Sequence, residues 1–392
     1  MTQNMVISGG GIGGLSAALA CARAGWKVDL LEQAVAFGEV GAGIQLGPNA
    51  VRLLQAWGLD AALRQVAAYP AHLEVRNALT TERLGVLPLG KTAEQRYGAP
   101  YLSIARADLH ALLLQAVQAQ GSVGLHLDSR VITIAQDAQR AHVQTVQDQL
   151  FEAPLLVGAD GLWSQVRKQV VENDSAPRVT GHLAFRAMLA QSELPAALRS
   201  QVVTAWMGPD FHAVHYPVHG GEWLNVVCIV HGKVAGDPQS WDHSANAQEL
   251  RQRLSQARGT LRDLIHTIDH WRLWPLTDRP PMASAAEQAR GRIALLGDAA
   301  HPMRPYLAQG AGMAIEDASA LAACISASPE QIPQALSRYA DMRWQRNARV
   351  QARAIRNGEI YHLKGFKQLG RDMALKLLGA KIMDVPWLYR GP

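Results

Sequence analysis

The stretch Met5-Val6-Ile7-Ser8-Gly9-Gly10-Gly11-Ile12-Gly13-Gly14 decides the fold near the start of the chain. A short, mostly apolar run that ends in glycines is typical of a buried parallel strand followed by a tight turn. Residues 15–24 are rich in alanine and leucine and predict a helix, and Gly25 follows where a helix C-cap is expected. Residues 28–31 form a second, mostly apolar run. This order of strand, turn, helix and strand predicts a βαβ unit.

The glycines follow the spacing G-x-G-x-x-G at Gly9, Gly11 and Gly14. The first glycine allows a tight turn, the second lets backbone N–H groups approach a pyrophosphate, and the third lets helix and strand pack closely. Glu32 comes directly after the second strand, where a carboxylate can accept both hydroxyls of an adenosine ribose. A glycine-rich turn alone is also compatible with an unrelated α/β fold. Together with Glu32 it predicts a dinucleotide site, without saying which dinucleotide binds.

Bulk properties exclude several classes of protein. The chain has 392 residues, so one large or two interleaved domains are expected, and its net charge of +5 is too small to indicate a nucleic-acid partner. Cys21, Cys228 and Cys324 lie far apart without a C-x-x-C pair, so we expect neither a disulfide framework nor a metal site. No leader pattern and no apolar run of ~18 residues occurs, so we expect a cytoplasmic protein without an integral membrane segment.

Further along the chain, helix and strand patterns alternate in blocks. Residues 103–117 have the apolar periodicity of a helix, with Asp108 available near its start. Residues 292–296 read as a buried strand, and residues 312–325 as a helix. Strand patterns separated by glycine and proline dominate the middle of the chain, at residues 183–189, 202–206, 213–218 and 223–230. The middle segment therefore predicts an antiparallel sheet inserted between stretches of the nucleotide-binding domain.

Two later Gly-Asp elements add polar groups to this domain. Gly158-Ala159-Asp160-Gly161 and Gly297-Asp298-Ala299-Ala300-His301-Pro302 both follow mostly apolar runs. An aspartate that follows a buried strand is delivered to the carboxyl edge of the sheet, where α/β proteins bind ligands. A helix N-cap is the alternative role for each aspartate. A dehydrogenase that binds only a nicotinamide dinucleotide would not need this pair of elements, so that class of enzyme is disfavoured.

With these motifs in place, the chain resembles the class A flavoprotein aromatic hydroxylases, which are single-component, FAD-dependent monooxygenases. The resemblance extends from residue 5 to about residue 350 and keeps the order of the family's motifs. The sequences around Gly41 and at residues 308–312 look most similar to those of the salicylate, 3-hydroxybenzoate and 6-hydroxynicotinate hydroxylases. The matching segments are residues 9–14 with Glu32, residues 41–49, 106–110, 158–167 and 297–312.

The resemblance implies an α/β fold with a Rossmann-like FAD-binding domain, an inserted antiparallel-sheet substrate domain and a C-terminal helical region. The FAD-binding domain is discontinuous in sequence. We expect it to comprise residues 1–72, 100–180 and 275–350, the substrate domain residues 73–99 and 181–274, and the helical tail residues 351–392.

The resemblance also implies which residues bind FAD. Arg106 would reach the ribityl chain or the pyrophosphate, although an ion pair with Asp108 is nearly as plausible from the sequence. Asp298 would contact the ribityl chain or lie by the pyrophosphate, and Asp160 belongs to an element implicated in FAD and NAD(P)H binding. The helix that opens at Gly310 would turn its N-terminus toward the flavin. The full expected set is Gly9, Gly11, Gly14, Glu32, Gly43, Arg106, Asp160, Asp298, Gly310, Ala311 and Gly312.

The reaction implied by the resemblance is hydroxylation of a small hydroxylated aromatic acid, such as a salicylate or hydroxybenzoate. NAD(P)H reduces FAD, O2 adds to give a flavin C4a-hydroperoxide, and a protein base deprotonates the substrate phenol. An epoxidase or N-hydroxylase on the same scaffold, and a non-catalytic FAD-binding protein, are the alternatives. The chain carries no second nucleotide fingerprint, as expected of a family in which NAD(P)H binds transiently.

For the base and its helper we predict His212 and Tyr216. On a strand, residues 212, 214 and 216 share one face, so a histidine and a tyrosine can both reach a substrate. The resemblance places a histidine and a tyrosine of this spacing in the pocket of the hydroxybenzoate and hydroxynicotinate relatives. His215 is a weaker candidate on the other face, and a packing role for either histidine is the alternative.

Four more residues are expected to line the substrate pocket: Gln45, Arg304, Pro305 and Tyr306. The hydroxynicotinate enzymes carry histidines where this chain has Gln45 and Tyr306, which argues against a pyridine substrate. The 3-hydroxybenzoate enzymes carry glutamine where this chain has Pro305. Arg304 is a candidate partner for a substrate carboxylate, with a solvent-facing loop arginine as the more common alternative.

The C-terminal segment of the chain is basic. Five arginines recur at intervals of three and four residues from Arg343 to Arg356, which predicts one stripe on a helix, most simply a solvated face. Residues 364–381 read as a basic amphipathic helix. A membrane surface or a partner subunit would fit such a helix, but packing against its own domain or a homodimer mate is the simpler expectation.

Overall fold

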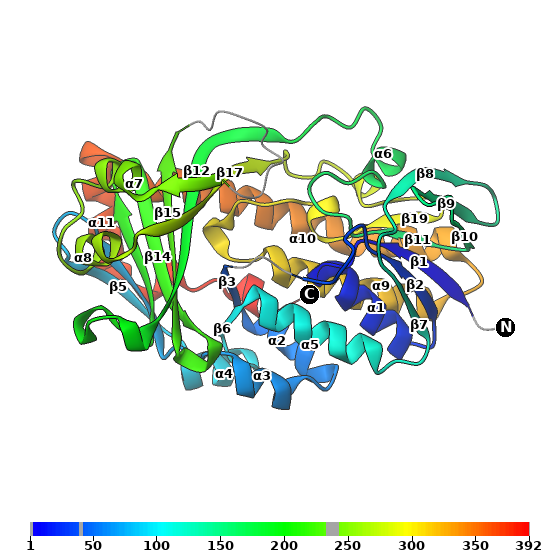
Figure 1. Cartoon of the computed structure of the whole chain (residues 1–392), viewed down its shortest axis with the longest axis horizontal. Helices are drawn as coiled ribbons and strands as arrows, with labels where there is room; N and C mark the ends of the chain where they lie inside the picture. Colours follow the sequence, from blue (N-terminus) through cyan, green and yellow to red (C-terminus); the bar gives the residue numbers. More distant parts are fainter. Residues whose placement is uncertain (1–2, 39–41, 233–242, 392) are drawn as a thin grey trace.

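The computed structural model describes residues 3–38, 42–232 and 243–391. In these ranges, one sheet lies at each end of the molecule, and long helices lie between the sheets (Figure 1). The motif at residues 41–49 begins at Gly41, which lies outside the described residues.

The first sheet has the strand order β18-β19-β11-β1-β2-β7 and is parallel except for β18. Its strands are β1 Asn4–Ser8, β2 Lys27–Leu31, β7 Val123–His126, β11 Leu156–Gly158, β18 Ala289–Arg290 and β19 Ile293–Leu295. Three separated stretches of sequence therefore build one sheet.

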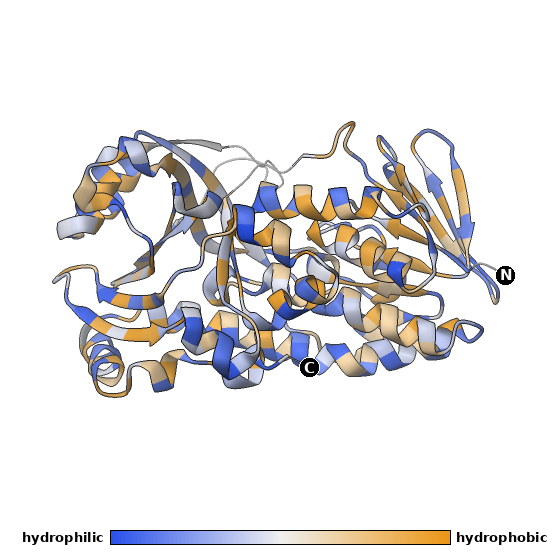
Figure 2. Ribbon diagram, turned by 90° about the horizontal axis from the view of Figure 1, so that it is seen from below, coloured by the Kyte–Doolittle hydropathy of each residue, from blue (hydrophilic) through white to orange (hydrophobic). Residues whose placement is uncertain are grey.

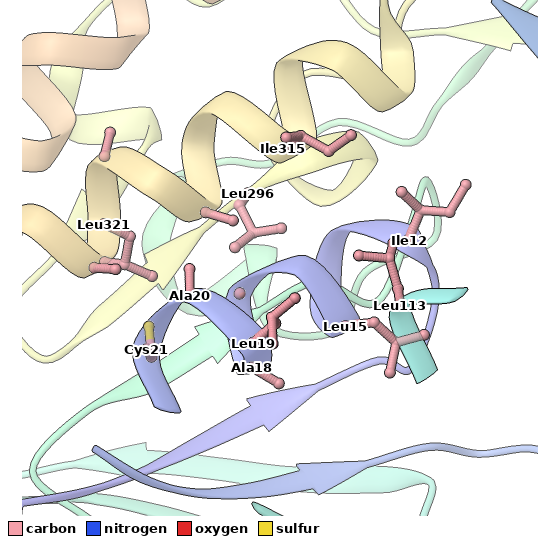
Figure 3. Packing of buried hydrophobic residues seen from close by; sticks show 14 of the residues in the cluster. Ile12, Leu15, Ala18, Leu19, Ala20, Cys21, Leu113, Leu296, Ile315 and Leu321 are labelled. Carbon is pink, nitrogen blue, oxygen red and sulfur yellow. The ribbon is translucent and has the colours of Figure 1, made fainter. Parts of the chain in front are cut away.

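Helix α1 (Ile12–Arg23) follows β1 and is almost entirely buried, which explains its run of alanine and leucine. It packs between α5 (Arg106–Gln118) and α9 (Gly310–Ala327), and Figure 3 shows Leu19 of α1 lying beneath Leu296 and α9. Gly25 ends the helix with φ +91°, a conformation that favours glycine. The helix expected from residue 103 begins later, because residues 102–105 form β6 (Leu102–Ala105), which pairs with β3 (Gly43–Leu46).

The second sheet is the inserted one, with the order β16-β17-β12-β15-β14-β13-β4-β5. All of its pairs are antiparallel except β4 with β13, which run parallel. Helices α7 (Ala247–Arg253) and α8 (Gly259–Thr267) bury one face of it, and the other face turns toward the first sheet (Figure 1). Its strands are β4 His72–Asn77, β5 Arg83–Pro88, β12 Arg178–Ala190, β13 Val203–Gly208, β14 Phe211–Val218, β15 Trp223–His231, β16 His243–Asn246 and β17 His270–Asp278.

Shorter elements complete the described ranges of the chain. Hydrophilic and hydrophobic residues alternate along many of the helices (Figure 2). No helix in the described ranges is long and apolar enough to cross a membrane. These shorter elements include a three-stranded sheet of β8 Val131–Gln136, β9 Ala141–Thr145 and β10 Leu150–Ala153, and the helices α2 Pro48–Ala56, α3 Asp60–Val66, α4 Gly90–Tyr97 and α6 Arg167–Val170.

Helix α10 (Ile332–Tyr361) corrects the prediction for the arginine stripe. Arg343 is completely buried, and its guanidinium pairs with Glu316 at 2.8 Å and with Asp317 at 2.7 Å, both on α9. Arg346 also pairs with Glu316, at 2.7 Å. The solvated-face prediction is therefore wrong for these two arginines, because α9 presents two consecutive buried carboxylates to this side of α10.

The tail ends in α11 (Gly365–Leu378), α12 (Ala380–Met383) and α13 (Pro386–Tyr389). Helix α11 contacts β5 of the inserted sheet through Leu375. Its other apolar side chains are exposed, with Phe366 at 92% and Leu377 at 77%. The amphipathic helix predicted for this segment is therefore present, but most of its apolar stripe does not pack against its own chain.

Candidate active site

The glycine loop after β1 has no room for side chains at two positions. A Cβ atom at Gly14 would lie 1.8 Å from the Gly9 carbonyl oxygen, and one at Gly9 would lie 2.3 Å from the Ala159 carbonyl oxygen. Gly9 also has φ +109°. Gly11 is the N-cap of α1 in an extended conformation. The loop therefore brings bare backbone and the N-terminus of α1 to the carboxyl edge of the sheet, as a pyrophosphate site requires.

The carboxylate of Glu32 stands beside this loop. Its Oε2 accepts a hydrogen bond from the Gly10 N–H at 2.6 Å, and its Oε1 accepts one from the Ala34 N–H at 2.8 Å. These two bonds fix the carboxylate at the end of β2. Each oxygen keeps a second lone pair, so the carboxylate can still accept a ribose hydroxyl.

The two Gly-Asp elements differ in how their aspartates are used. The Asp160 carboxylate accepts hydrogen bonds from the Ser164 hydroxyl at 2.5 Å and from the Gln165 and Val166 N–H groups at 2.8 and 3.2 Å. It therefore acts as a cap for the turn that leads into α6. Asp298, in contrast, is exposed in the short 3-10 turn that follows β19.

A buried pair holds the Asp298 turn in place. The Gly297 N–H donates to Asp317 Oδ2 at 3.1 Å, and His301 Nε2 lies 2.5 Å from the same oxygen. Burial raises the pKa of Asp317, but the neighbouring His301 and Arg343 more than offset this and hold it below the ordinary range. The histidine of the Gly-Asp-Ala-Ala-His-Pro run is thus an anchor between this turn and α9.

The N-terminus of α9 is open at its first residue. A Cβ at Gly310 would meet nothing within 4 Å, whereas one at Gly312 would lie 2.8 Å from Gln309 Oε1. Ala311 between them is only partly buried. The first N–H groups of a helix have no partner within it, so this end can donate hydrogen bonds to the polar edge of a ligand. The glycine cradle, Glu32 and this helix end fit FAD.

On the opposite wall, His212 and Tyr216 lie on the same face of β14 but make separate contacts. His212 is buried, and its ring centre lies 5.1 Å from that of Tyr306. The Tyr216 hydroxyl donates to the Gly43 carbonyl at 2.6 Å, and Gly43 has no room for a side chain, since its Cβ would lie 2.7 Å from the Tyr216 ring. Tyr216 therefore joins the inserted sheet to β3.

The other predicted pocket residues differ in their burial and in their hydrogen bonds. Tyr306 is buried, and its hydroxyl lies 2.9 Å from His182 Nδ1. Gln45 Oε1 accepts a hydrogen bond from the Tyr101 hydroxyl at 2.7 Å, and Pro305 is exposed. Arg304 donates from Nε to Asp278 Oδ2 at 2.7 Å. Arg304 is thus neither a solvent-facing arginine nor an unpaired one.

Sequence reasoning missed Arg186 on β12. Burial lowers its pKa, the nearby Tyr216 raises it and Arg106 lowers it again, and its guanidinium lies 5.1 Å from the Trp274 ring centre. Its buried Nε has no hydrogen-bond partner among the described residues, and no carboxylate there forms an ion pair with it. The one sequence signal for Arg186 is the alternation of side chains along β12, which places it on the same face of the strand as His182.

His212 was predicted from the sequence, but the line of histidines to which it belongs was not. His212 Nδ1 lies 2.8 Å from His362 Nε2, and His362 Nδ1 lies 3.1 Å from His231 Nε2. His231 Nε2 lies 3.3 Å from His182 Nε2. Burial, followed by the neighbouring histidines His362 and His182, lowers the pKa of His212 well below its ordinary value. His212 is therefore neutral at pH 7.

Comparison with known proteins identifies the family to which this site belongs. Residues 2–354 match the family model described as FAD binding domain. The chain belongs to this FAD-binding family. The predicted FAD cofactor and the predicted fold class are thereby confirmed, and the chain is an FAD-dependent monooxygenase.

Relatives in the family are similar over nearly their whole length. The 3-hydroxybenzoate 6-hydroxylase of Polaromonas naphthalenivorans (strain CJ2) is 38% identical over 388 residues, which cover 98% of this chain and 95% of that protein. The 6-hydroxynicotinate 3-monooxygenase of Bordetella bronchiseptica is 34% identical over 349 residues, covering 88% and 89%. A salicylate hydroxylase solved with its substrate superposes with a TM-score of 0.82 at 26% identity, covering 99% and 95%.

Proposed function

We propose that the protein hydroxylates a small hydroxylated aromatic acid with NAD(P)H and O2 as co-substrates. The single observation that supports an acidic substrate is Arg186, a partly buried arginine whose buried Nε has no hydrogen-bond partner and which forms no ion pair with a carboxylate among the described residues. Removing a cation from water without an ion-pair partner is costly, and a substrate carboxylate would offset that cost. Arg304 is the poorer choice because Asp278 already pairs with it.

The predicted FAD-binding residues would hold the cofactor against this wall. Gly9, Gly11 and Gly14 would bind the pyrophosphate, Glu32 the ribose, and Arg106 and Asp298 the region between pyrophosphate and ribityl chain. Bound FAD, reduced by NAD(P)H, would supply the activated oxygen. Asp160 would act indirectly by fixing its turn. The end of α9, comprising Gly310, Ala311 and Gly312, would face the ring.

His212 is our proposed base. Its neutral ring can accept the substrate's phenolic proton at Nε2, provided that its own proton is on Nδ1 and is donated to His362 Nε2, which is 2.8 Å away. Deprotonation raises the electron density of the substrate ring. Gln45, Pro305 and Tyr306 would line the pocket, and Tyr216 would support it by joining β14 to β3.

A substrate panel tests the function. Purified protein loaded with FAD is given NADH or NADPH and a series of hydroxybenzoates, and product and hydrogen peroxide are measured together. We expect at least one hydroxybenzoate to stimulate NAD(P)H consumption and to be hydroxylated in proportion to it. Consumption without any hydroxylated product from every member would contradict the proposal.

Replacing Arg186 tests the substrate class separately. Because a hydrogen bond to a charged group is worth about 1.5–3 kcal/mol, Arg186→Gln should raise the KM of the aromatic acid roughly 10–100-fold. The KM of the matching phenol without a carboxylate should not change, nor should the FAD content. Arg178→Gln is the control, since Arg178 is on the same strand but 53% exposed. An equal rise in KM for acid and phenol would rule out the carboxylate role.

A further inference from the structure

Three histidines from separate elements meet beside the candidate pocket. His182 on β12 and His231 on β15 lie directly opposite each other in the antiparallel ladder, and His362 follows the end of α10. One nitrogen from each ring lies within 4.8 Å of the others. His182 and His362 are buried, whereas His231 is exposed. The cluster therefore has one side that solvent can reach.

The spacing of the nitrogens matches that of metal ligands. His231 Nε2 lies 3.3 Å from His182 Nε2 and 3.1 Å from His362 Nδ1. Imidazole nitrogens bind zinc at about 2.0–2.1 Å in tetrahedral geometry, which places neighbouring ligand atoms about 3.3 Å apart. Two of the three separations therefore already suit a bound ion, and all three nitrogens lie within 4.8 Å of one another.

Hydrogen bonding alone cannot satisfy this arrangement. His231 Nε2 faces two other ring nitrogens, but a ring nitrogen carries either one proton or one lone pair. If it is protonated, it can donate well to only one neighbour. If it is not, it can accept from only one. One of the two close contacts is therefore left unsatisfied in every neutral tautomer, whereas a cation at the centre would engage all three lone pairs.

Outer contacts complete the pattern expected of metal ligands. Ligating histidines usually direct their second nitrogen to a hydrogen-bond partner. The second nitrogen of His182, Nδ1, lies 2.9 Å from the Tyr306 hydroxyl. That of His362, Nε2, lies 2.8 Å from His212 Nδ1.

We propose that His182, His231 and His362 bind a divalent transition-metal ion, with solvent at the fourth position. Three imidazoles without a carboxylate suit Zn²⁺, Cu²⁺ or Ni²⁺ rather than Mg²⁺ or Ca²⁺. The site lies outside the FAD cradle and does not depend on the proposed function. The cysteine pattern used to predict the absence of a metal could not reveal it, because its ligands are histidines distant in sequence.

Metal binding would change the proposed base, and this consequence rests on the proposed function. An ion on His362 Nδ1 places that ring's proton on Nε2, from which it is donated to His212 Nδ1. His212 then carries its own proton on Nε2 and can no longer accept one there. Bound metal would therefore inhibit hydroxylation by fixing the wrong tautomer of His212.

Calorimetric titration of the tag-free, FAD-loaded protein with Zn²⁺ at pH 7.5 tests the site. We expect one saturable site per chain in the wild type and in His266→Ala, which removes an exposed histidine on α8. His231→Ala should weaken this site roughly 100-fold or more, since even outer-sphere changes cost 10–100-fold. Flavin absorbance and thermal melting show that each variant is folded. Equal Zn²⁺ affinity in His231→Ala and wild type, or no saturable site in wild type, would overturn the proposal.

The inhibition is measured separately from binding. Zn²⁺ should lower the rate of hydroxylation over the same concentration range in which it binds, and the residual activity of His231→Ala should no longer respond. Binding without inhibition would refute the tautomer argument and leave the site standing. Failure of every hydroxybenzoate as a substrate would refute the proposed function while leaving the titration informative.

Discussion

The FAD-facing side of the site and the inserted-sheet side are built in different ways. On the FAD-facing side, Gly9, Gly14 and Glu32 lie close in sequence, and their positions follow from one βαβ unit. On the sheet side, His212 meets His362 across 150 residues. The first side depends on backbone that tolerates no added atoms, and the second on side chains that converge from distant elements. We therefore expect the first to fail abruptly on substitution and the second to change its chemistry while keeping the fold.

The largest expected effect is at the glycine loop. Gly14→Ala places a Cβ where the Gly9 carbonyl oxygen lies 1.8 Å away, which the loop cannot absorb without moving. We expect loss of bound FAD, measured as flavin absorbance per protein after purification. Gly121→Ala is the control, because a Cβ there would meet nothing within 4 Å. A yellow Gly14→Ala protein with full FAD content would contradict the claim that the glycine loop tolerates no added atoms.

A smaller but still large effect, on the stability of the fold, is expected at the buried ion pairs beneath the Gly-Asp turn. Arg343→Leu leaves Glu316 and Asp317 buried without this partner, and breaking a buried pair costs about 3–5 kcal/mol. The free energy of unfolding, measured in urea, should fall by that amount. Arg356→Leu, an exposed member of the same stripe, should change it by less than about 0.5 kcal/mol. Equal effects of the two substitutions would show that α10 is not held by the buried pair.

Acid should act mainly on the sheet side. Burial lowers the pKa of His215 and of His182 to about 4, and that of His362 to about 3, whereas unfolded histidine titrates near 6.5. The unfolded chain therefore binds more protons between pH 6.5 and 4, so stability is complete above pH 6.5 and is lost as the pH falls. Each of the three histidines should contribute about 1.3 kcal/mol, so we expect the free energy of unfolding to be about 4 kcal/mol lower at pH 5.5 than at pH 7.5.

Urea unfolding without added metal, at these two pH values, measures this loss. A stability that stays constant or rises toward pH 5.5 would show that these histidines are not held neutral by the fold. Saturating Zn²⁺ should raise stability at pH 7.5 if the histidine site binds it, because a ligand of the folded state stabilises that state.

These differences explain what could be predicted from the sequence. The glycine positions were predictable because a tight turn and a close helix each demand glycine locally. The order of strands in the inserted sheet was not, since β4 and β13 pair across a long stretch of chain. The burial of Arg343 was missed because its partners lie on another helix. The histidine cluster was missed because His182 and His231 are 49 residues apart, and His231 and His362 131 apart.

The central claim is that a side chain of the inserted sheet performs chemistry on a substrate held against bound FAD. Coupled turnover by His212→Asn tests it most directly, with hydroxylated product measured per NAD(P)H consumed. We predict unchanged FAD content and a rate of product formation lower by roughly 100-fold or more, because a positioned base contributes typically 10²–10⁴-fold. His215→Asn, on the other face of β14, should form product at nearly the wild-type rate. Full coupled turnover by His212→Asn would contradict the account.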